Sequence, residues 1–437
     1  VVKMYKVLVV KNSVLPAHLK CVLDTPEDSV EIGLDSLVNN GLFFSGWVTS
    51  SEVATKDITV YVKHNGQKQT SRLRENRPDV VAVMSTNFPS FKSSNECGFS
   101  FPIDWSTELG CFGVEVNGFE YDLYNIEIAG QLKVLKGSDD WLFLDNDTNR
   151  SVEQYKGEFV LSIFAKAVWL KYLLGLKNFI KKEKISYAFL IAPSKEMVFG
   201  DYYPIPKGKF TPVEQVIRLA NIFNTSVLHP IVELQNSIRP SFRKCDSHWT
   251  HSGSLAAWYT VLGALKLPIN KCEELFKDDI YKEAPVSGDL GNKTYPPSKA
   301  KEFLLQGVSY QNWVVYDNGL PNFGRIIVTE NKAAIFSKTL LIFGSSSSYT
   351  MLSYVVRTFS KVVFVHSAAN VDVKFTQWLK PDFLVMQSNG RFVVKPPTVN
   401  YCVSNEIGKK WALINTEEQI NVLGIQKKSL KNQSVKN

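Results

Sequence analysis

The first part of this 437-residue chain alternates short apolar runs with polar turns. Asn65-Gly66 and Asn117-Gly118 are typical hairpin turns between such runs. The runs are Leu42 to Val48, Ile58 to Val62, Val80 to Met84, Gly98 to Ile103 and Phe112 to Val116. Because each run has the length of a strand, the pattern predicts a small antiparallel β domain over residues 1–130, and we expect a sandwich.

From about residue 131 the pattern changes to an alternation of strand and helix periods. The expected strands are Ile185 to Ile191, Thr339 to Phe343, Lys361 to Val365 and Phe383 to Met386, and the expected helices cover residues 158–182, 211–223, 252–266 and 348–359. Such alternation predicts an α/β domain over residues 131–402, with a mainly parallel sheet and helices on both faces. Residues 267–335 are less regular, and we expect an insertion over the site there.

The C-terminal residues 403–437 are expected to form a polar tail, disordered around Lys427, Lys428 and Lys431. The longest helical candidate, Phe159 to Ile180, contains three lysines, which predicts an amphipathic helix against a sheet and excludes a membrane span. The apolar start of the chain is interrupted by lysines, unlike a secretory signal. We therefore expect a cytoplasmic protein, or a periplasmic one if a signal segment was removed.

Composition narrows the classes of function. Hydrophobic residues make up 44% of the chain and aromatic residues 12%, which is enough for substantial cores and excludes a disordered protein. The net charge of +8 favours anionic partners, but no nucleic-acid-binding motif is present, so we expect no nucleic-acid partner. The six cysteines are scattered, as in a protein with reduced thiols. The six histidines lack a cluster of carboxylates or cysteines at ligand spacing, so no metal site is expected.

Two short segments contain the groups that serine chemistry needs. Asp246-Ser247-His248-Trp249 places a carboxylate and an imidazole on one side of an extended or turning backbone. Gly344-Ser345-Ser346-Ser347-Ser348 lies between an expected strand and an expected helix, where N–H groups and the helix dipole would face a developing oxyanion. A serine attacks when an imidazole takes its proton and a carboxylate holds the imidazole. An ester-forming or ester-cleaving enzyme is therefore the leading hypothesis.

Each segment also has a simpler interpretation. Serines before a helix are commonly N-caps, and a histidine beside Trp249 is often a hydrogen-bonded core residue. However, Asp246 and His248 precede an apolar helical run from Leu255 to Leu265, and active-site groups of α/β folds gather in loops at helix starts. Cys245 ranks below the serines as a nucleophile, because no turn at a helix start accompanies it.

Seven motifs follow one another along the second domain. They are Gly137 to Leu144, Gln154 to Gly157, Ala192 to Glu196, Asp246 to Trp249, Gly288 to Leu290, Gly344 to Ser346 and Pro381-Asp382. In this order they resemble the SGNH-hydrolase-like domain of the alginate O-acetyltransferases over about residues 131–402. The resemblance implies a circularly permuted SGNH-hydrolase-like sheet, in which Asp-x-His precedes the serine.

The resemblance also implies roles for individual residues. Asp246 would orient His248, His248 would act as base and then as acid, and Ser346 would be the nucleophile. The chain departs from the family at Ser345, where the family has Asp or Thr. It departs again at Asn389-Gly390-Arg391, where the family often has Glu-Arg.

Four further residues are candidates around this triad. Gly288, Asn292 and the backbone N–H of Ser346 are candidate oxyanion donors, since this chemistry commonly combines main-chain N–H groups with a side-chain amide. A plain turn is the alternative for Gly288. Arg391 is a candidate substrate-binding residue, with a structural ion pair as the alternative. His251 is another, with an exposed polar residue at a helix start as the alternative.

The resemblance implies an O-acetyltransferase that moves acetyl through a serine acyl-enzyme to a hydroxyl of a bacterial surface polysaccharide or its precursor. The expected partners are a glycan acceptor and an acetyl donor, with no bound cofactor. Acetyl-CoA is the natural donor in the cytoplasm, whereas a membrane assembly partner would deliver acetyl in the periplasm. A carbohydrate esterase with the same triad and a non-catalytic glycan-binding subunit remain alternatives. The β domain would place glycan or serve as a docking or stabilising module.

Overall fold

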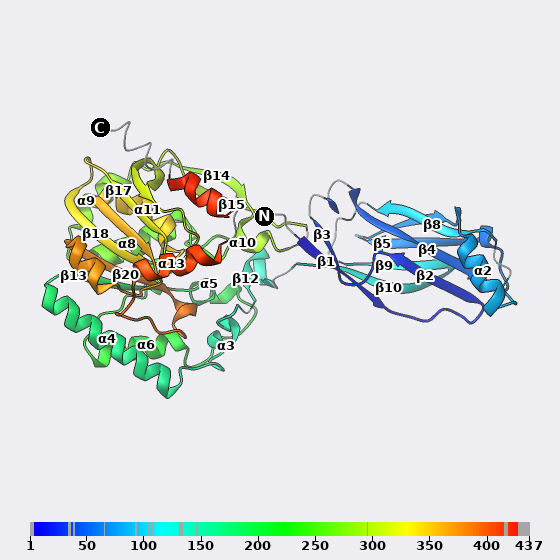
Figure 1. Ribbon diagram of the computed structural model, residues 1–437, viewed down its shortest axis with the longest axis horizontal. Helices are drawn as coiled ribbons and strands as arrows, with labels where there is room; N and C mark the ends of the chain where they lie inside the picture. Colours follow the sequence, from blue (N-terminus) through cyan, green and yellow to red (C-terminus); the bar gives the residue numbers. More distant parts are fainter. Residues whose placement is uncertain are drawn as a thin grey trace. The chain divides into compact units, whose positions relative to one another are not determined.

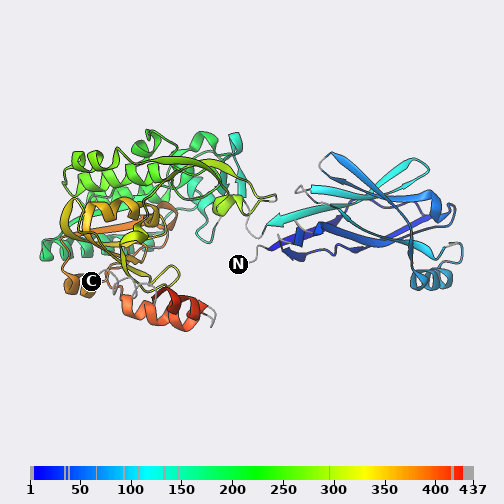
Figure 2. The same cartoon turned by 90° about the horizontal axis from the view of Figure 1, so that it is seen from above.

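The computed structural model describes residues 4–33, 36–37, 40–64, 66–91, 94–103, 105, 109–130, 134–145, 147–294, 296–414 and 418–426 (Figures 1 and 2). The chain divides into two compact units. Unit 1 contains Val1–Lys133 and Gly291–Ser298, and unit 2 contains Val134–Leu290 and Lys299–Asn437. The short segment Gly291–Ser298 was expected in the second domain, so its place in unit 1 is a correction.

Unit 1 contains two antiparallel sheets. One has the order β3-β1-β10-β9-β5-β6 and the other the order β2-β4-β8-β7. The strands are β1 (Met4–Lys11), β2 (Leu19–Thr25), β3 (Val30–Gly33), β4 (Leu42–Ser50), β5 (Ile58–His64), β6 (Gln67–Arg72), β7 (Glu75–Asn76), β8 (Glu96–Ile103), β9 (Leu109–Val116) and β10 (Phe119–Gly130). Phe44, Val60 and Phe112 are fully buried in one core to which both sheets contribute, as in a sandwich.

The run Val80 to Met84 is the exception in unit 1, because it lies in helix α2 (Pro78–Asn87) and not in a strand. Pro78 occupies the first turn, where its fixed φ favours a helix start. Val80 and Met84, four residues apart, are the buried residues of this helix. The predicted strand was therefore wrong, since a short apolar run does not separate a strand from a buried helix face.

Unit 2 is built on a six-stranded mixed sheet with the order β13-β20-β18-β19-β17-β16. Its strands are β13 (Ser186–Ala192), β16 (Val314–Asp317), β17 (Ile326–Glu330), β18 (Phe336–Gly344), β19 (Phe359–His366) and β20 (Phe383–Asn389). The pairings β13-β20, β20-β18 and β18-β19 are parallel, whereas β17 and β16 are antiparallel additions. The four predicted strands are the parallel ones. The other sheets of the described chain are antiparallel, and the circular permutation stays a prediction.

Side chains alternate between the two faces of this sheet, and each face has its own core. Leu190 and Ile342 lie in the core under helices α8 (His251–Ala264) and α11 (Ser348–Thr358). Ile191 and Phe343 lie in the core under helices α4 (Ile163–Glu183) and α6 (Pro212–Ile222). Because every second residue of a strand points to the same side, the continuous apolar runs belong to strands that are buried on both faces. Helices lie on both sides of the sheet (Figure 1).

Shorter elements complete unit 2. They are β11 (Val134–Lys136), β12 (Leu142–Leu144), β14 (Tyr281–Val286), β15 (Ala300–Leu305), α3 (Ser151–Tyr155), α5 (Lys195–Val198), α7 (Ile231–Gln235), α9 (Ile269–Phe276), α10 (Gly288–Gly291), α12 (Val373–Leu379) and α13 (Val403–Leu413). No helix among the described residues has both the length and the apolar character needed to cross a bilayer.

The C-terminal segment is more structured than a polar tail. Helix α13 begins at Val403, and residues 418–426 are also helical. Ile414 and Val422 are buried in a small core with Leu320. The prediction for residues 403–437 is therefore corrected in its first part, because apolar residues at helical spacing pack against unit 2. Lys427, Lys428 and Lys431 lie outside the described residues.

Candidate active site

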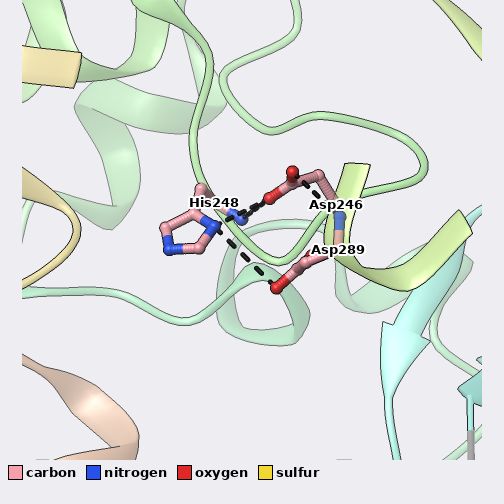
Figure 3. A group of neighbouring side chains, drawn as sticks. All are labelled: Asp246, His248 and Asp289. Atoms are coloured by element: carbon pink, nitrogen blue, oxygen red, sulfur yellow. Dashed lines mark hydrogen bonds and ion pairs between the residues drawn. The ribbon is translucent and has the colours of Figure 1, made fainter. Parts of the chain in front are cut away.

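Three side chains singled out in the sequence meet beyond the carboxyl end of β18. The His248 Nδ1 atom lies 2.8 Å from Asp246 Oδ1, and His248 Nε2 lies 3.2 Å from the Oγ atom of Ser346. Figure 3 shows the first of these contacts, with the other ring nitrogen directed away from Asp246. With Nδ1 donating to the carboxylate, Nε2 is the acceptor for the Ser346 hydroxyl. The arrangement can transfer a proton from serine to histidine.

Asp246 is buried, and its turn is closed by its own side chain. The backbone N–H of His248 donates to Asp246 Oδ1 at 2.8 Å, which is the bond of an Asx turn. Burial alone would raise the pKa of Asp246, but the hydrogen bonds and charge of His248 hold it well below its usual range. Asp246 is therefore a carboxylate at neutral pH and favours the imidazolium that forms during proton transfer.

A second carboxylate, Asp289, holds the residue between the acid and the base. Its Oδ1 and Oδ2 atoms accept from the backbone N–H and the hydroxyl of Ser247, each at 2.6 Å. The backbone N–H of Asp289 donates to Asp246 Oδ2 at 3.1 Å. The Oδ2 atom of Asp289 lies 3.9 Å from His248 Nδ1 (Figure 3). Asp289 thus holds Ser247 in place, and with it the residues on either side, Asp246 and His248. The sequence placed it in a motif but gave it no role, because its partners lie far away along the chain.

Gly288 packs directly behind the triad. Its φ is +68°, and a Cβ atom built there would lie 2.4 Å from the Cβ of Asp246. A side chain would displace the carboxylate, so this position requires glycine. The geometry favours the turn over the oxyanion donor for Gly288.

Lys195 clamps the backbone that leads into the triad. Its Nζ atom donates to the carbonyl oxygens of Arg243, Lys244 and Asp246 at 2.9, 3.2 and 2.7 Å. Only 3% of the residue is exposed, and burial lowers the pKa of Lys195 to about 8, against the opposing charges of Asp246 and Asp289. All three donors of the ammonium are therefore used to hold one loop.

The serine turn is held by two neutral amides at the end of β20. Gln387 Oε1 lies 2.7 Å from the backbone N of Ser345 and 2.8 Å from the hydroxyls of Ser345 and Ser348. Asn389 Oδ1 lies 3.1 Å from Ser345 Oγ and 2.8 Å from Ser347 Oγ.

These contacts separate the four serines. The side chains of Ser345, Ser347 and Ser348 are buried in structural bonds, whereas Ser346 is half-buried and directed to His248. The geometry therefore selects Ser346 as the candidate nucleophile.

A small cavity of about 30 Å³ lies beside His248. Apolar walls come from Pro193, Phe242 and Trp249, and Asn389 and Arg391 also line it. Asn389 thus lines the cavity while its Oδ1 atom accepts from the serine hydroxyls. Asn389 was noted in the sequence only as a departure from the family. A polar residue at the end of a parallel strand was the signal that could have identified it.

Two other predicted residues, Asn292 and Arg391, each have a contact outside the triad. Asn292 belongs to unit 1, where its backbone carbonyl accepts from the Tyr5 hydroxyl at 3.2 Å, and its role as an oxyanion donor stays a prediction. Arg391 lines the cavity, and its Nε atom lies 3.4 Å from Asp147 Oδ2, which is the ion pair of the alternative interpretation.

His251 begins α8 but is half-buried, so the expectation of an exposed residue was wrong. Burial, followed by the charge of Arg243, lowers the pKa of His251 to about 4, and the ring is neutral. Burial likewise raises the pKa of the Cys245 thiol, which makes it a poor nucleophile.

Asp246, His248 and Asp289 also form a set that could hold a metal ion, because their ligand atoms lie within 4.8 Å of one another. The sequence did not predict this set, since Asp289 is remote in the chain. His248 Nδ1 and Asp246 Oδ1 already share a hydrogen bond, and a catalytic triad accounts for this pair as well.

No protein-family model matches this chain, and no curated protein matches it at a significant level. Among solved structures, Bacillus cereus PatB1 has a TM-score of 0.43 and 12% identity, with 60% of this chain and 97% of that chain covered. The O-acetyltransferase domain of Pseudomonas putida AlgJ has a TM-score of 0.35 and 15% identity, with 64% and 100% covered. A DHHW family protein from Eubacterium siraeum has a TM-score of 0.37 and 10% identity, with 67% and 96% covered.

Proposed function

We propose that this chain is a serine-dependent O-acetyltransferase of bacterial surface polysaccharide or its precursor. The observation that supports a serine mechanism is the continuous chain of contacts from Asp246 through His248 to Ser346, at 2.8 and 3.2 Å. The motif resemblance in the sequence supports acetyl as the group and polysaccharide as the acceptor. The SGNH-hydrolase-like character of the domain is part of the same proposal.

In the first half-reaction, Ser346 Oγ attacks the carbonyl carbon of the acetyl donor while His248 Nε2 takes the hydroxyl proton. The Asp246 carboxylate stabilises the imidazolium. The oxygen that becomes negative lies near the N-terminal end of α11, where the helix dipole favours it, and the Asn389 NH₂ group is a candidate donor to it. His248 then returns the proton to the leaving group, and an acetyl ester on Ser346 remains.

In the second half-reaction, a sugar hydroxyl gives its proton to His248 Nε2 and attacks the acetyl carbon. The ester bond to Ser346 breaks, and His248 returns the proton to Ser346 Oγ. The cavity beside His248 is small, at about 30 Å³, which favours a short acyl group over a long one. Acetyl-CoA is the proposed donor for a cytoplasmic chain, and a membrane assembly partner is the proposed donor for a periplasmic one.

A carbohydrate esterase is the second candidate. The His248 side chain is 32% exposed, so water can reach the group that would activate it. In an esterase, water takes the place of the sugar hydroxyl in the second half-reaction, and acetate is released. The geometry of the triad serves both reactions equally.

Partition of the acetyl group tests the proposal. The protein is incubated with acetyl-CoA or an aryl acetate, with and without oligosaccharides from bacterial surface polysaccharides, and glycan-bound acetyl and free acetate are measured by mass spectrometry. Acetyl on the glycan that disappears in Ser346→Ala but not in Ser345→Ala supports the transferase. Acetate alone, with the same dependence on Ser346, supports the esterase. Equal results for the parent and Ser346→Ala would mean that the triad is not catalytic, as in a glycan-binding subunit.

A further inference from the structure

Helix α4 turns an unusual face outward from unit 2. Its inner face is apolar, with Trp169, Leu173 and Leu176 among the residues buried in the core against the sheet. The exposed residues of this 21-residue helix, all of which are described, are Ile163, Phe164, Ala167, Lys171, Leu174, Lys177, Asn178, Lys181 and Lys182. The outer face therefore combines apolar and basic side chains and contains no acidic one.

The apolar part of this face is concentrated at the start of the helix. Ile163 is 88% exposed and Phe164 is 79% exposed, although each would be expected in a core. Single exposed apolar residues are common, but two adjacent large ones that project from a helix start form a feature that needs a partner. The described part of unit 2 buries the core residues of α4 but leaves these two side chains largely exposed.

Helix α6 packs beside helix α4. The Gln215 Oε1 atom accepts from the backbone N–H of Leu161 at 3.0 Å, and Lys177 Nζ donates to the Phe223 carbonyl at 3.0 Å, so the two helices lie side by side (Figure 1). Ile222, at the end of α6, is 70% exposed. We name the α4–α6 face by its exposed residues, which are Ile163, Phe164, Leu174, Ile222, Lys171, Lys177, Lys181, Lys182 and Arg218.

Acidic groups around the α4–α6 face are already engaged. Glu158 pairs with Lys156 at 2.6 Å, and Glu214 pairs with Lys207 at 2.6 Å and caps the start of α6. Glu183 is half-buried and accepts from Gln377. The charge that this face presents to a partner is therefore positive.

We propose that the α4–α6 face binds the surface of a bilayer that contains anionic phospholipids. Helix α4 is about 31 Å long, and its outer face offers lysines to lipid phosphate groups and two large apolar side chains at one end to the acyl boundary. Ile163 and Phe164 enter the boundary between headgroups and acyl chains, while the lysines contact phosphate groups. An anionic bilayer presents phosphate groups along the basic row and acyl chains to the apolar pair at the same time, which makes it the partner that we choose. The proposal is independent of the triad.

Sedimentation with vesicles tests the proposal on the whole chain. Phosphatidylcholine vesicles are compared with vesicles that also contain phosphatidylglycerol, and the salt concentration is varied. We expect binding to the anionic vesicles that weakens with salt, because the Debye length shrinks to about 8 Å at physiological ionic strength. Each of the substitutions Lys171→Gln, Lys181→Gln and Lys182→Gln should weaken binding by about fivefold, and the triple variant should combine the three losses. Ile163→Ser with Phe164→Ser should weaken it by about tenfold or more.

Matched variants separate position from composition. Ile238 and Ile280 are 97% and 70% exposed, so Ile238→Ser with Ile280→Ser makes the same chemical change away from the face. Lys271, Lys282 and Lys299 are exposed and serve as the charge control. Both controls should bind as the parent does. The proposal is overturned if the parent does not sediment with anionic vesicles, if the controls weaken binding as much as the α4–α6 variants, or if Ile163 and Phe164 prove to join two copies of the chain.

Discussion

The two loops that form the triad are held by different chemistry. The loop with Asp246 and His248 is fixed by charged groups, the Lys195 ammonium and the Asp289 carboxylate. The serine turn is fixed by the neutral amides of Gln387 and Asn389. The first loop therefore responds to protonation of its clamp, whereas the geometry of the second loop does not depend on pH. This division keeps the candidate nucleophile fixed while the acid and base carry the proton.

The largest effect is expected at the charge that acts inside the triad. Asp246→Asn should lower the rate of acyl-enzyme formation by about 10³- to 10⁴-fold, because an amide favours the wrong tautomer of His248. The rate of aryl acetate hydrolysis measures this loss. A loss of less than tenfold would mean that Asp246 does not orient the base. The fold should be retained at neutral pH, since the change is nearly isosteric.

The second-largest effect is expected at Gln387, the amide that holds the serine turn. Gln387→Leu should lower the free energy of unfolding by about 3 kcal/mol or more, because the buried N–H of Ser345 and the hydroxyls of Ser345 and Ser348 lose their common acceptor. Urea unfolding measures the change. The deficit should be the same at about pH 6 and about pH 9, since no group of this clamp titrates between them. A deficit that varies with pH would remove the contrast between the loops.

Lys195, the buried cation that holds the loop with Asp246 and His248, should behave differently. Lys195→Met should lower the free energy of unfolding by about 2 kcal/mol, because three buried carbonyls lose their donor. Burial lowers the pKa of Lys195 to about 8 in the folded protein, below the value of about 10.4 in the unfolded chain. The unfolded chain therefore binds more protons between these values, and the parent gains stability as the pH rises through that window.

The deficit of Lys195→Met relative to the parent should accordingly grow between about pH 8 and about pH 10. Urea unfolding of both proteins over this range gives the measurement. Groups that titrate in both proteins cancel in the difference. A deficit that is constant or shrinks with rising pH would show that Lys195 is not held with a lowered pKa.

The smallest effect is expected at the second carboxylate. Asp289→Ala should lower the rate of acyl-enzyme formation by about tenfold, because the backbone between Asp246 and His248 loses both acceptors and the base is misplaced. Asp289→Asn keeps an acceptor and a similar shape, so it should recover most of the rate. If the two variants were equally slow, the charge of Asp289 would matter more than its position.

The sequence predicted the parts that depend on local patterns. Apolar runs that are buried on both faces identified the four parallel strands, and the Asp246-x-His248 spacing identified a carboxylate and an imidazole that can meet within one turn. The run Val80 to Met84 was misjudged because burial of residues four apart on α2 resembles a short strand in the sequence. Strands β16 and β17 were missed because they lack the continuous burial of the parallel strands: of their nine residues, only Ile327 is both apolar and buried.

The site residues that the sequence missed act through long-range contacts. Asp289 and Gln387 reach Ser247 and Ser345 only after the chain has folded, so no spacing in the sequence reveals their roles. Asn292 follows Asp289 closely in the chain, yet it belongs to unit 1, because the segment from Gly291 to Ser298 leaves unit 2. Asn292 therefore stays a prediction as an oxyanion donor, and Asn389, at the end of a parallel strand, is the donor that we propose.

The location of the acyl group on the protein tests the account most directly. The parent and His248→Ala are exposed to a slow acetyl donor, quenched in acid, digested and mapped by mass spectrometry. The account predicts one acetyl group on Ser346 in the parent and none in His248→Ala. Acetyl on Ser345, Ser347, Ser348 or Cys245, or an equal amount on Ser346 without His248, would contradict it.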